Sequence, residues 1–328
     1  MPSLRYFSQL YGRAAFALLC GLGLTLGSAL YARQADAVTT LANSAADTKA
    51  AATLRIKMDA LKEALSRNAY QRPLVLESSE TKNGALGEVY AVLDYPFASV
   101  DAALDGPAHW CEVMMLHVNN RFCQAHTKAT GSGELTLKVT RTFDQSADQA
   151  VLLPFAYQVK ASTPDYFAVT LTADVGPFGT YNHCILLEAI SLPTGRSFLH
   201  FAYSYDLTLM AEMAMKTYFS TVGASKMGFT ALEPSGSVVT GARPNYIRGM
   251  RGLMERNAMR YYLAVDAYLA SHKIAPAEQQ DWRLNRWFTS IEQYPMQLHE
   301  MDRATYLKLK RLDFQSLQPA PAAAASRP

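Results

Sequence analysis

The chain has 328 residues, 49% of them hydrophobic, which is enough apolar material for one large domain with additions. It contains 31 Lys and Arg against 28 Asp and Glu; residues 1–37 hold three of the basic and one of the acidic residues, which leaves 28 against 27. A balance this close to neutral gives no electrostatic case for binding nucleic acid.

The N-terminal segment has the layout of a secretion signal. Two arginines precede an apolar run over residues 14–24, which is too short to span a bilayer. The sequence Ala35-Asp36-Ala37 follows as a small-x-small cleavage site. We therefore predict a signal peptide over residues 1–37, cleaved after Ala37, and a periplasmic or secreted mature protein. The alternative is an uncleaved membrane anchor.

Three cysteines follow the predicted cleavage site. Export makes a disulfide plausible, and Cys111 and Cys123 are close enough in sequence to close a small loop. Cys184 lies in an apolar run and is expected to stay free and buried. The sequence has no Cys-x-x-Cys, so neither a redox motif nor haem attachment is supported.

The first elements after the leader are indicated by periodicity and turn residues. Apolar residues at helical spacing over 47–68 predict an amphipathic helix, so residues 38–85 are expected to form an N-terminal helix and linker. Residues 86–95 alternate as a strand. Two short helices are expected to begin at Pro96 and Pro107.

The middle of the chain changes period twice. From about residue 117 to 206 apolar residues alternate, which is typical of antiparallel strands joined by short turns. A helix over 207–220 and a hairpin over 226–240 are expected next. A continuous apolar stripe then predicts one long helix over 249–272.

The C-terminal part is predicted to be helical and then disordered. Pro276 and Pro295 each begin a helix with its own apolar stripe, so residues 273–317 are expected to form a helical extension. The tail 318–328 is rich in Ala and Pro, a composition typical of disorder.

This order of elements predicts an α+β, helix-grip fold, in which a curved antiparallel sheet is closed by the long helix. The concave face of such a sheet cannot be buried by the sheet itself, so the helix must cover it. An elongated, largely apolar cavity is expected between the two.

The segment around the two short helices points to a family. It reads Leu93-Asp94-Tyr95-Pro96-Phe97-Ala98-Ser99-Val100, and then Leu104-Asp105-Gly106-Pro107-Ala108-His109-Trp110. With the order of elements, it resembles the START-like (SRPBCC) superfamily of lipid-transfer proteins, polyketide cyclases and plant hydrophobic-ligand binders. The resemblance covers about residues 86–272 and implies a helix-grip domain that holds a hydrophobic ligand. The chain departs from the pattern by the elements inserted over 207–240 and by the helical extension.

Residues expected to line the cavity include charged and aromatic side chains. Arg141 has the strand spacing of its apolar neighbours, so we expect it to be buried and paired with Glu188. It either closes an internal ion pair or anchors the acidic head of a ligand. Tyr157, Phe167 and Tyr203 would supply contact area, and His200 is a further candidate in the same cavity. A structural or solvent-facing role for His200 is the simpler alternative.

Four arginines surround the start of the long helix: Arg248, Arg251, Arg256 and Arg260. One interpretation is a solvated face, or a platform for the appended helices. The other is peripheral contact with an anionic membrane surface.

No catalytic motif, metal-ligand spacing or cofactor motif is recognisable in the sequence. The favoured function is binding or transfer of a hydrophobic or amphipathic small molecule, such as a lipid. One alternative is a cyclase- or aromatase-like enzyme that uses the same cavity with a cluster of Arg, Glu and His. The other is an envelope scaffold with a filled core that acts through its helices at 47–68 and 276–316, which an exposed apolar stripe on either helix would favour.

Overall fold

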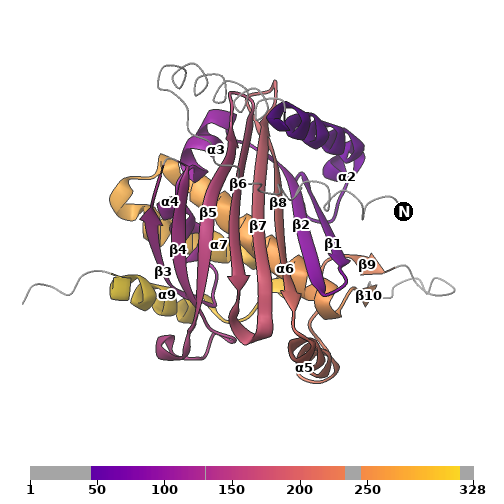
Figure 1. Cartoon of the computed structure of the whole chain (residues 1–328), viewed down its shortest axis with the longest axis vertical. Coiled ribbons are helices and arrows are strands. Elements are labelled where there is room, and N and C mark those ends of the chain that lie inside the picture. Colours follow the sequence, from indigo (N-terminus) through magenta and orange to yellow (C-terminus); the bar gives the residue numbers. More distant parts are fainter. Residues whose placement is uncertain (1–45, 130, 233–244, 318–328) are drawn as a thin grey trace, which may run out of the picture. The chain divides into compact units, whose positions relative to one another are not determined.

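The computed structural model describes residues 46–129, 131–232 and 245–317 (Figure 1). The predicted signal peptide and the C-terminal tail lie outside these ranges, as do residues 237–240 of the expected hairpin. Everything described below concerns residues 47–317.

The centre of the fold is an eight-stranded antiparallel sheet (Figure 1). Its strands run in the order β1-β2-β8-β7-β6-β5-β4-β3, so β2 pairs with β8 across more than 100 residues of chain. The stretch expected as linker supplies the edge strand β1. The strands are β1 Leu74–Glu80, β2 Gly84–Leu93, β3 Asn120–Thr127, β4 Ser132–Val139, β5 Val151–Ser162, β6 Tyr166–Val175, β7 Thr180–Ser191 and β8 Ser197–Leu207.

The two faces of the sheet bury different side chains because neighbouring strand residues point in opposite directions. Leu187 and Phe201 belong to the large core on the side of the long helix. Ile190 and Phe198 belong to a smaller core on the other face, called the outer face below. Leu54 and Leu65 of the N-terminal helix cover that outer face. The helix occupies residues 47–60 and continues as α2, Lys62–Ser66.

The long helix α6, Gly249–Ala270, closes the sheet as predicted (Figure 1). It packs most extensively on β2 and β1. Val265 is 0% exposed at this interface. The two short helices are α3, Phe97–Leu104, and α4, Pro107–Met114. The predicted α+β, helix-grip fold is confirmed.

The C-terminal extension covers the side of α6 that faces away from the sheet. It consists of α7 Pro276–Ile291, α8 Pro295–Leu298 and α9 Arg303–Leu317. Two helices were expected, but the chain turns before Arg303, where Asp302 accepts a hydrogen bond from the Thr305 backbone amide at 2.9 Å. Trp287 is fully buried, and its indole nitrogen donates to the Arg260 carbonyl at 3.0 Å.

Buried charges hold α9 against β3. The Arg121 Nε lies 2.9 Å from an Asp313 carboxylate oxygen. Lys310, 0% exposed, donates to the Asn120 carbonyl at 2.5 Å and to Asp313 at 3.1 Å. Because each charge is paired, the desolvation cost is offset at this contact.

The remaining elements connect the layers. Helix α5, Leu209–Ser220, follows β8 as expected. Among the described residues, β9, Ala231–Leu232, pairs with β10, Asn245–Tyr246. The Cys111–Cys123 disulfide is present, with Cα atoms 5.3 Å apart, and the Cys184 thiol is free and half-buried. None of the described helices has the length and apolar character needed to cross a membrane.

Candidate ligand-binding site

Arg141 does not enter the interior. Strand β4 ends at Val139, so the alternation expected to bury Arg141 stops before it. Its side chain is exposed and lies over the Phe178 ring at 4.6 Å. Its backbone amide donates to the Gln145 side chain at 2.7 Å. The prediction that Arg141 is buried and paired with Glu188 is wrong.

Glu188 and His200 lie on the outer face, away from α6. His200 Nδ1 is 2.9 Å from a Glu188 carboxylate oxygen, and its Nε2 is 3.0 Å from Glu88. The Tyr90 hydroxyl donates to Glu88 at 3.0 Å, and the Tyr166 hydroxyl donates to Glu188. The predicted grouping of Glu188 and His200 with an interior cavity is therefore wrong, because both point to the opposite face.

This outer network holds a charged imidazole. Burial by itself lowers the pKa of His200, but the hydrogen bonds and charges of Glu188 and Glu88 outweigh it and raise the pKa to about 9. Burial raises the pKa of each of these two carboxyls, and His200 more than offsets this, so both pKa values are lowered. The arrangement stabilises the packing of the outer face.

The predicted aromatic residues do face α6. Tyr157, Phe167 and Tyr203 are all buried in the large core. Tyr157 is tied down, since its hydroxyl donates to the Leu104 carbonyl at 3.0 Å. Phe167 is enclosed by apolar neighbours. Tyr203 instead belongs to a group of rings near the α5 end of the sheet.

We call this group the interior aromatic cluster. Its ring centroids lie 5.2 Å apart for His183 and Tyr205, 5.6 Å for Tyr203 and Tyr205, and 5.6 Å for Tyr203 and Tyr261. Further contacts continue at 5.0 to 6.3 Å, so the cluster comprises Phe155, His183, Phe201, Tyr203, Tyr205, Tyr261 and His117.

The polar tips of this cluster are satisfied to different degrees. His183 Nε2 lies 2.8 Å from the Thr180 hydroxyl, and His117 Nδ1 accepts a hydrogen bond from the Asn119 backbone amide at 3.2 Å. The Tyr203 hydroxyl and His183 Nδ1 are 3.5 Å apart, at the limit of a hydrogen bond. Among the described residues, none hydrogen-bonds the Tyr205 hydroxyl. Burial lowers the pKa of His183 to about 4, so the ring is neutral at pH 7. Apolar surface with a few convergent polar groups is the usual lining of a ligand site.

Two of the four arginines on the long helix are buried. Arg260 donates to Glu300 at 2.7 Å and to the Leu298 carbonyl at 3.4 Å, so it does serve as a platform for the extension. Arg256 is 3% exposed. Membrane contact through Arg256 and Arg260 is therefore wrong. Arg248 is exposed, and Arg251 donates to the Ser78 hydroxyl at 3.1 Å.

Arg256 has no hydrogen-bond acceptor among the described residues, and its Nε is completely enclosed. Burial, and then the positive charge of Arg260, lower the pKa of Arg256 to about 10. The guanidinium remains charged at pH 7 without an ion-pair partner within reach. Burying an unpaired charge lowers the stability of the fold, and packing alone does not explain why Arg256 is buried in this way.

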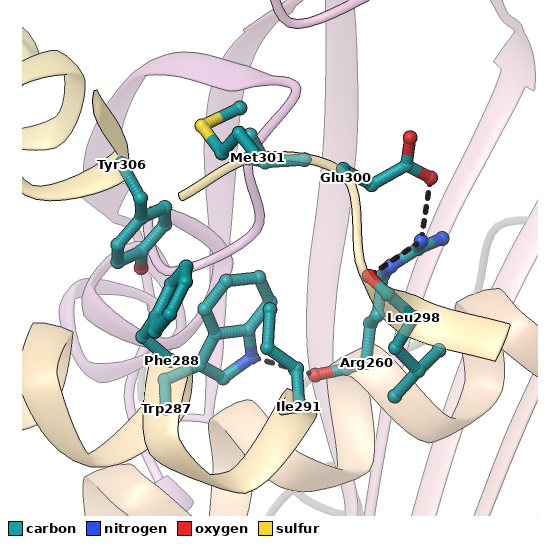
Figure 2. Close-up of a pocket in the computed structure, with 9 residues that line it drawn as sticks. Arg260, Trp287, Phe288, Ile291, Leu298, Glu300, Met301 and Tyr306 are labelled. Carbon is teal, nitrogen blue, oxygen red and sulfur yellow. Dashed lines mark hydrogen bonds and ion pairs between the residues drawn. The ribbon is translucent and has the colours of Figure 1, made fainter. Parts of the chain in front are cut away.

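The space between α6 and the extension is nearly filled (Figure 2). A cavity of about 10 Å³ lies there, no more than one water molecule needs. Figure 2 shows Arg260 bonded to Glu300 and Leu298 beside this cavity. The lining residues are Val118, Arg260, Trp287, Phe288, Ile291, Leu298, Glu300, Met301 and Tyr306. This space cannot hold a lipid-sized ligand.

A larger, open groove of about 310 Å³ lies on the outer face beside the N-terminal helix. Met58, Leu65 and Val92 form part of its apolar floor. The two cations at its rim already have acidic neighbours: Lys62 lies 2.8 Å from Asp59, and Arg196 lies 3.8 Å from Asp94. No buried polar group in this groove lacks a partner.

Exposed apolar side chains gather at the α5 end of the molecule. Leu209, Met210 and Met213 of α5 are 57 to 75% exposed. Val175 at the end of β6 and Phe178 in the adjoining β6–β7 connection are exposed as well. A concentration of this kind is typical of an interaction surface.

Sequence reasoning recognised Arg256 and Arg260 but left open a solvated face, a platform for the appended helices, or contact with a membrane surface. One signal could have favoured the platform: the apolar stripe of residues 284–291 needs a partner surface. The nearest candidate along the chain is the side of the long helix opposite its own apolar stripe, and this side contains both arginines. No group of three or more His, Cys, Asp or Glu in the described ranges is placed to hold a metal ion.

No protein-family model matches the chain, and no curated protein matches its sequence. Human StAR-related lipid transfer protein 5 is similar in structure at a TM-score of 0.30 and 10% identity, over 54% of this chain and 90% of that one. Ara h 8.0201 is similar at a TM-score of 0.32 and 7% identity, over 57% of this chain and 99% of that one. A norcoclaurine synthase from Thalictrum is similar at a TM-score of 0.30 and 5% identity, over 46% of this chain and 90% of that one.

Similarities this distant carry no argument about a ligand. The architecture itself is plain: strand β2, helices α3 and α4, six further antiparallel strands, and the long helix α6 across the sheet. The described part of the chain has a START-like, helix-grip fold.

Proposed function

We propose that this is an exported protein that binds a hydrophobic or amphipathic small molecule against the interior aromatic cluster. The cluster supports this because it gathers aromatic rings on the α6 side of the sheet, while the Tyr203 hydroxyl has only a 3.5 Å contact with His183 and none of the described residues hydrogen-bonds the Tyr205 hydroxyl. Phe201 and Val265 at the centre are fully enclosed, so the ligand enters by displacing side chains toward α5. The leader sequence and the Cys111–Cys123 disulfide support export.

The residues expected for the enzyme alternative do not come together in the interior. A cyclase-like mechanism in this cavity was expected to use an Arg, Glu and His cluster, but Arg141 is exposed and Glu188 and His200 occupy the outer face. The scaffold alternative called for an exposed apolar stripe on the N-terminal or C-terminal helices. The exposed large apolar residues there are Ile56, Met296 and Leu312, and each lies on a different helix.

Binding is tested with a matched pair of tyrosine variants. Tyr203 and Tyr90 are both buried in central strands, but Tyr203 faces α6 and Tyr90 faces the N-terminal helix. The apolar fluorescent probe N-phenylnaphthylamine is titrated into the protein. Tyr203→Leu should weaken probe binding by about tenfold, the loss of one well-packed aromatic contact. Tyr90→Leu should leave the affinity unchanged.

A second measurement identifies the natural ligand. Native mass spectrometry of the protein purified from its own compartment should reveal a co-purifying apolar molecule. Absence of probe binding to the wild type, or equal losses in the two variants, would contradict the proposal.

A further inference from the structure

Arg256 is a buried cation that the fold leaves uncompensated. It is 3% exposed, and none of the described residues accepts a hydrogen bond from it. Buried charges in folded proteins are normally paired, because desolvation is otherwise not repaid. Where a fold violates this rule, the missing partner is often a ligand rather than a side chain.

The neighbouring charges make the imbalance larger. Arg260 lies one helical turn further along α6 and adds a second guanidinium. The carboxylate beside them is Glu300, which already accepts from Arg260 at 2.7 Å and from Lys226 at 3.2 Å. Three cations therefore share one anion in this part of the described structure.

The chemistry of the missing partner follows from the guanidinium group. Its N–H groups form a planar fork that matches the two oxygens of a carboxylate or phosphate. We propose that Arg256, supported by Arg260, binds an oxyanion, namely the phosphate or carboxylate group of a small molecule. A bound oxyanion would reduce the excess positive charge and supply the acceptors that Arg256 lacks.

The position of Arg256 connects this site to the interior aromatic cluster. Helix α6, which contains Arg256, packs against β8, which contains Tyr205 of that cluster, and against α5, which contains Tyr218. An anionic head on Arg256 would thus leave its apolar part beside Tyr205. The inference rests on the proposed function and adds the class of head group. The Lys226 and Glu300 side chains, which pair beside Arg260, are 37% and 23% exposed.

The decisive variant is Arg256→Met, which removes the charge but keeps an apolar side chain. Because Arg256 has no partner to lose, this variant should melt at a higher temperature than the wild type without ligand. Inorganic phosphate should raise the melting temperature of the wild type and not that of the variant. By calorimetry, phosphate affinity should fall about 10- to 100-fold, as expected for one or two charge-assisted hydrogen bonds.

Two further variants make the result specific. Arg67→Met removes an exposed arginine elsewhere, so it should keep the wild-type response to phosphate. Arg256→Lys keeps the charge and loses the fork, so it should remain folded and bind phosphate more weakly. No phosphate binding to the wild type, or an Arg256→Met variant that melts lower with its phosphate response intact, would overturn the inference.

Dodecyl phosphate and dodecanol separate this inference from the proposed function. If Arg256→Met weakens the binding of dodecyl phosphate but not that of dodecanol, the anion inference and the proposed function both stand, and the site takes an amphipathic anion. If both compounds bind and neither depends on Arg256, the anion inference fails while the proposed function stands. If inorganic and dodecyl phosphate bind equally through Arg256 and dodecanol does not bind, the site takes free phosphate and the proposed function fails.

Discussion

His200 is the residue whose protonation is most closely tied to folding. It is buried between Glu88 and Glu188, with Tyr90 stacked on its ring at 4.4 Å. The cation and the two carboxylates leave one net negative charge, and the nearby Lys57 lies over the Tyr90 ring at 4.6 Å. Losing the proton from His200 would leave two buried carboxylates without their shared cation.

The pH dependence of stability follows from these pKa directions. The pKa of His200 is raised from 6.5 to about 9, so its contribution is complete below pH 6.5 and is lost as pH rises through 9. The two carboxyl pKa values are lowered from 4.5, so their contribution is present above pH 4.5 and is lost on further acidification. The network is therefore most stabilising between about pH 4.5 and 6.5.

We expect His200→Gln to remove much of the loss of folding stability that the wild type shows at alkaline pH. Between about pH 6 and 9.5, the free energy of unfolding of the wild type should fall by up to about 3 kcal/mol more than that of the variant. Urea unfolding at a series of pH values measures this difference. His126→Gln, at an exposed position on β3, is the control and should follow the wild type. Parallel pH profiles for wild type and His200→Gln would show that the imidazole is not charged in the fold.

At the scale of elements, α6 is a central helix rather than a surface lid. The sheet covers one side, and α7 and α8 cover another, so polar as well as apolar residues are buried. Arg256, Arg260 and Glu255 are examples. A helix in this position tolerates a new charge only where a partner already exists.

Val265→Asp should show how strongly α6 holds the sheet. The side chain is 0% exposed in the large core, so the substitution buries an unpaired carboxylate and removes apolar contacts. We expect a loss of roughly 3 kcal/mol or more in the free energy of unfolding, measured by thermal or urea denaturation. Leu312→Asp on α9, at a 55% exposed position, is the control and should change stability little. Equal melting of the two variants would mean that Val265 does not face the sheet.

At the scale of the whole molecule, α6 covers one face of the sheet and the N-terminal helix covers part of the other, and the Cys111–Cys123 disulfide joins α4 to β3. The Cys111–Cys123 bridge spans 12 positions in sequence. A short loop of this kind stabilises mainly by restricting the unfolded chain. Such bridges persist mainly in oxidising compartments, so the disulfide bears on the proposed export.

Export and the disulfide are therefore tested together. Protein isolated from its own host should begin at Val38 and give a linked Cys111–Cys123 peptide in a non-reducing map. Cys111→Ser with Cys123→Ser should lower the free energy of unfolding by about 2 to 3 kcal/mol relative to the oxidised protein. Cys184→Ser is the control, since that thiol forms no bridge. A chain that begins at Met1 with both thiols free would contradict export.

The type and order of elements were determined by the sequence, because they depend on local periodicity. Alternation over residues 117–206 indicated the antiparallel strands, and the stripe over 249–272 indicated α6 within two residues. The pairing of Cys111 with Cys123 was predictable for the same reason, since short loops limit the alternatives.

Only the tertiary structure decided which polar side chains are buried, and where. Arg141 follows the end of β4, and the point at which a strand stops depends on its pairing with β3 and β5. Arg260 bonds to Leu298 and Glu300, 38 and 40 residues away along the chain, and α6 packs beside strands that are distant from it in sequence. Periodicity gives the direction of a side chain relative to its own element, whereas burial and partners depend on which distant segment packs there.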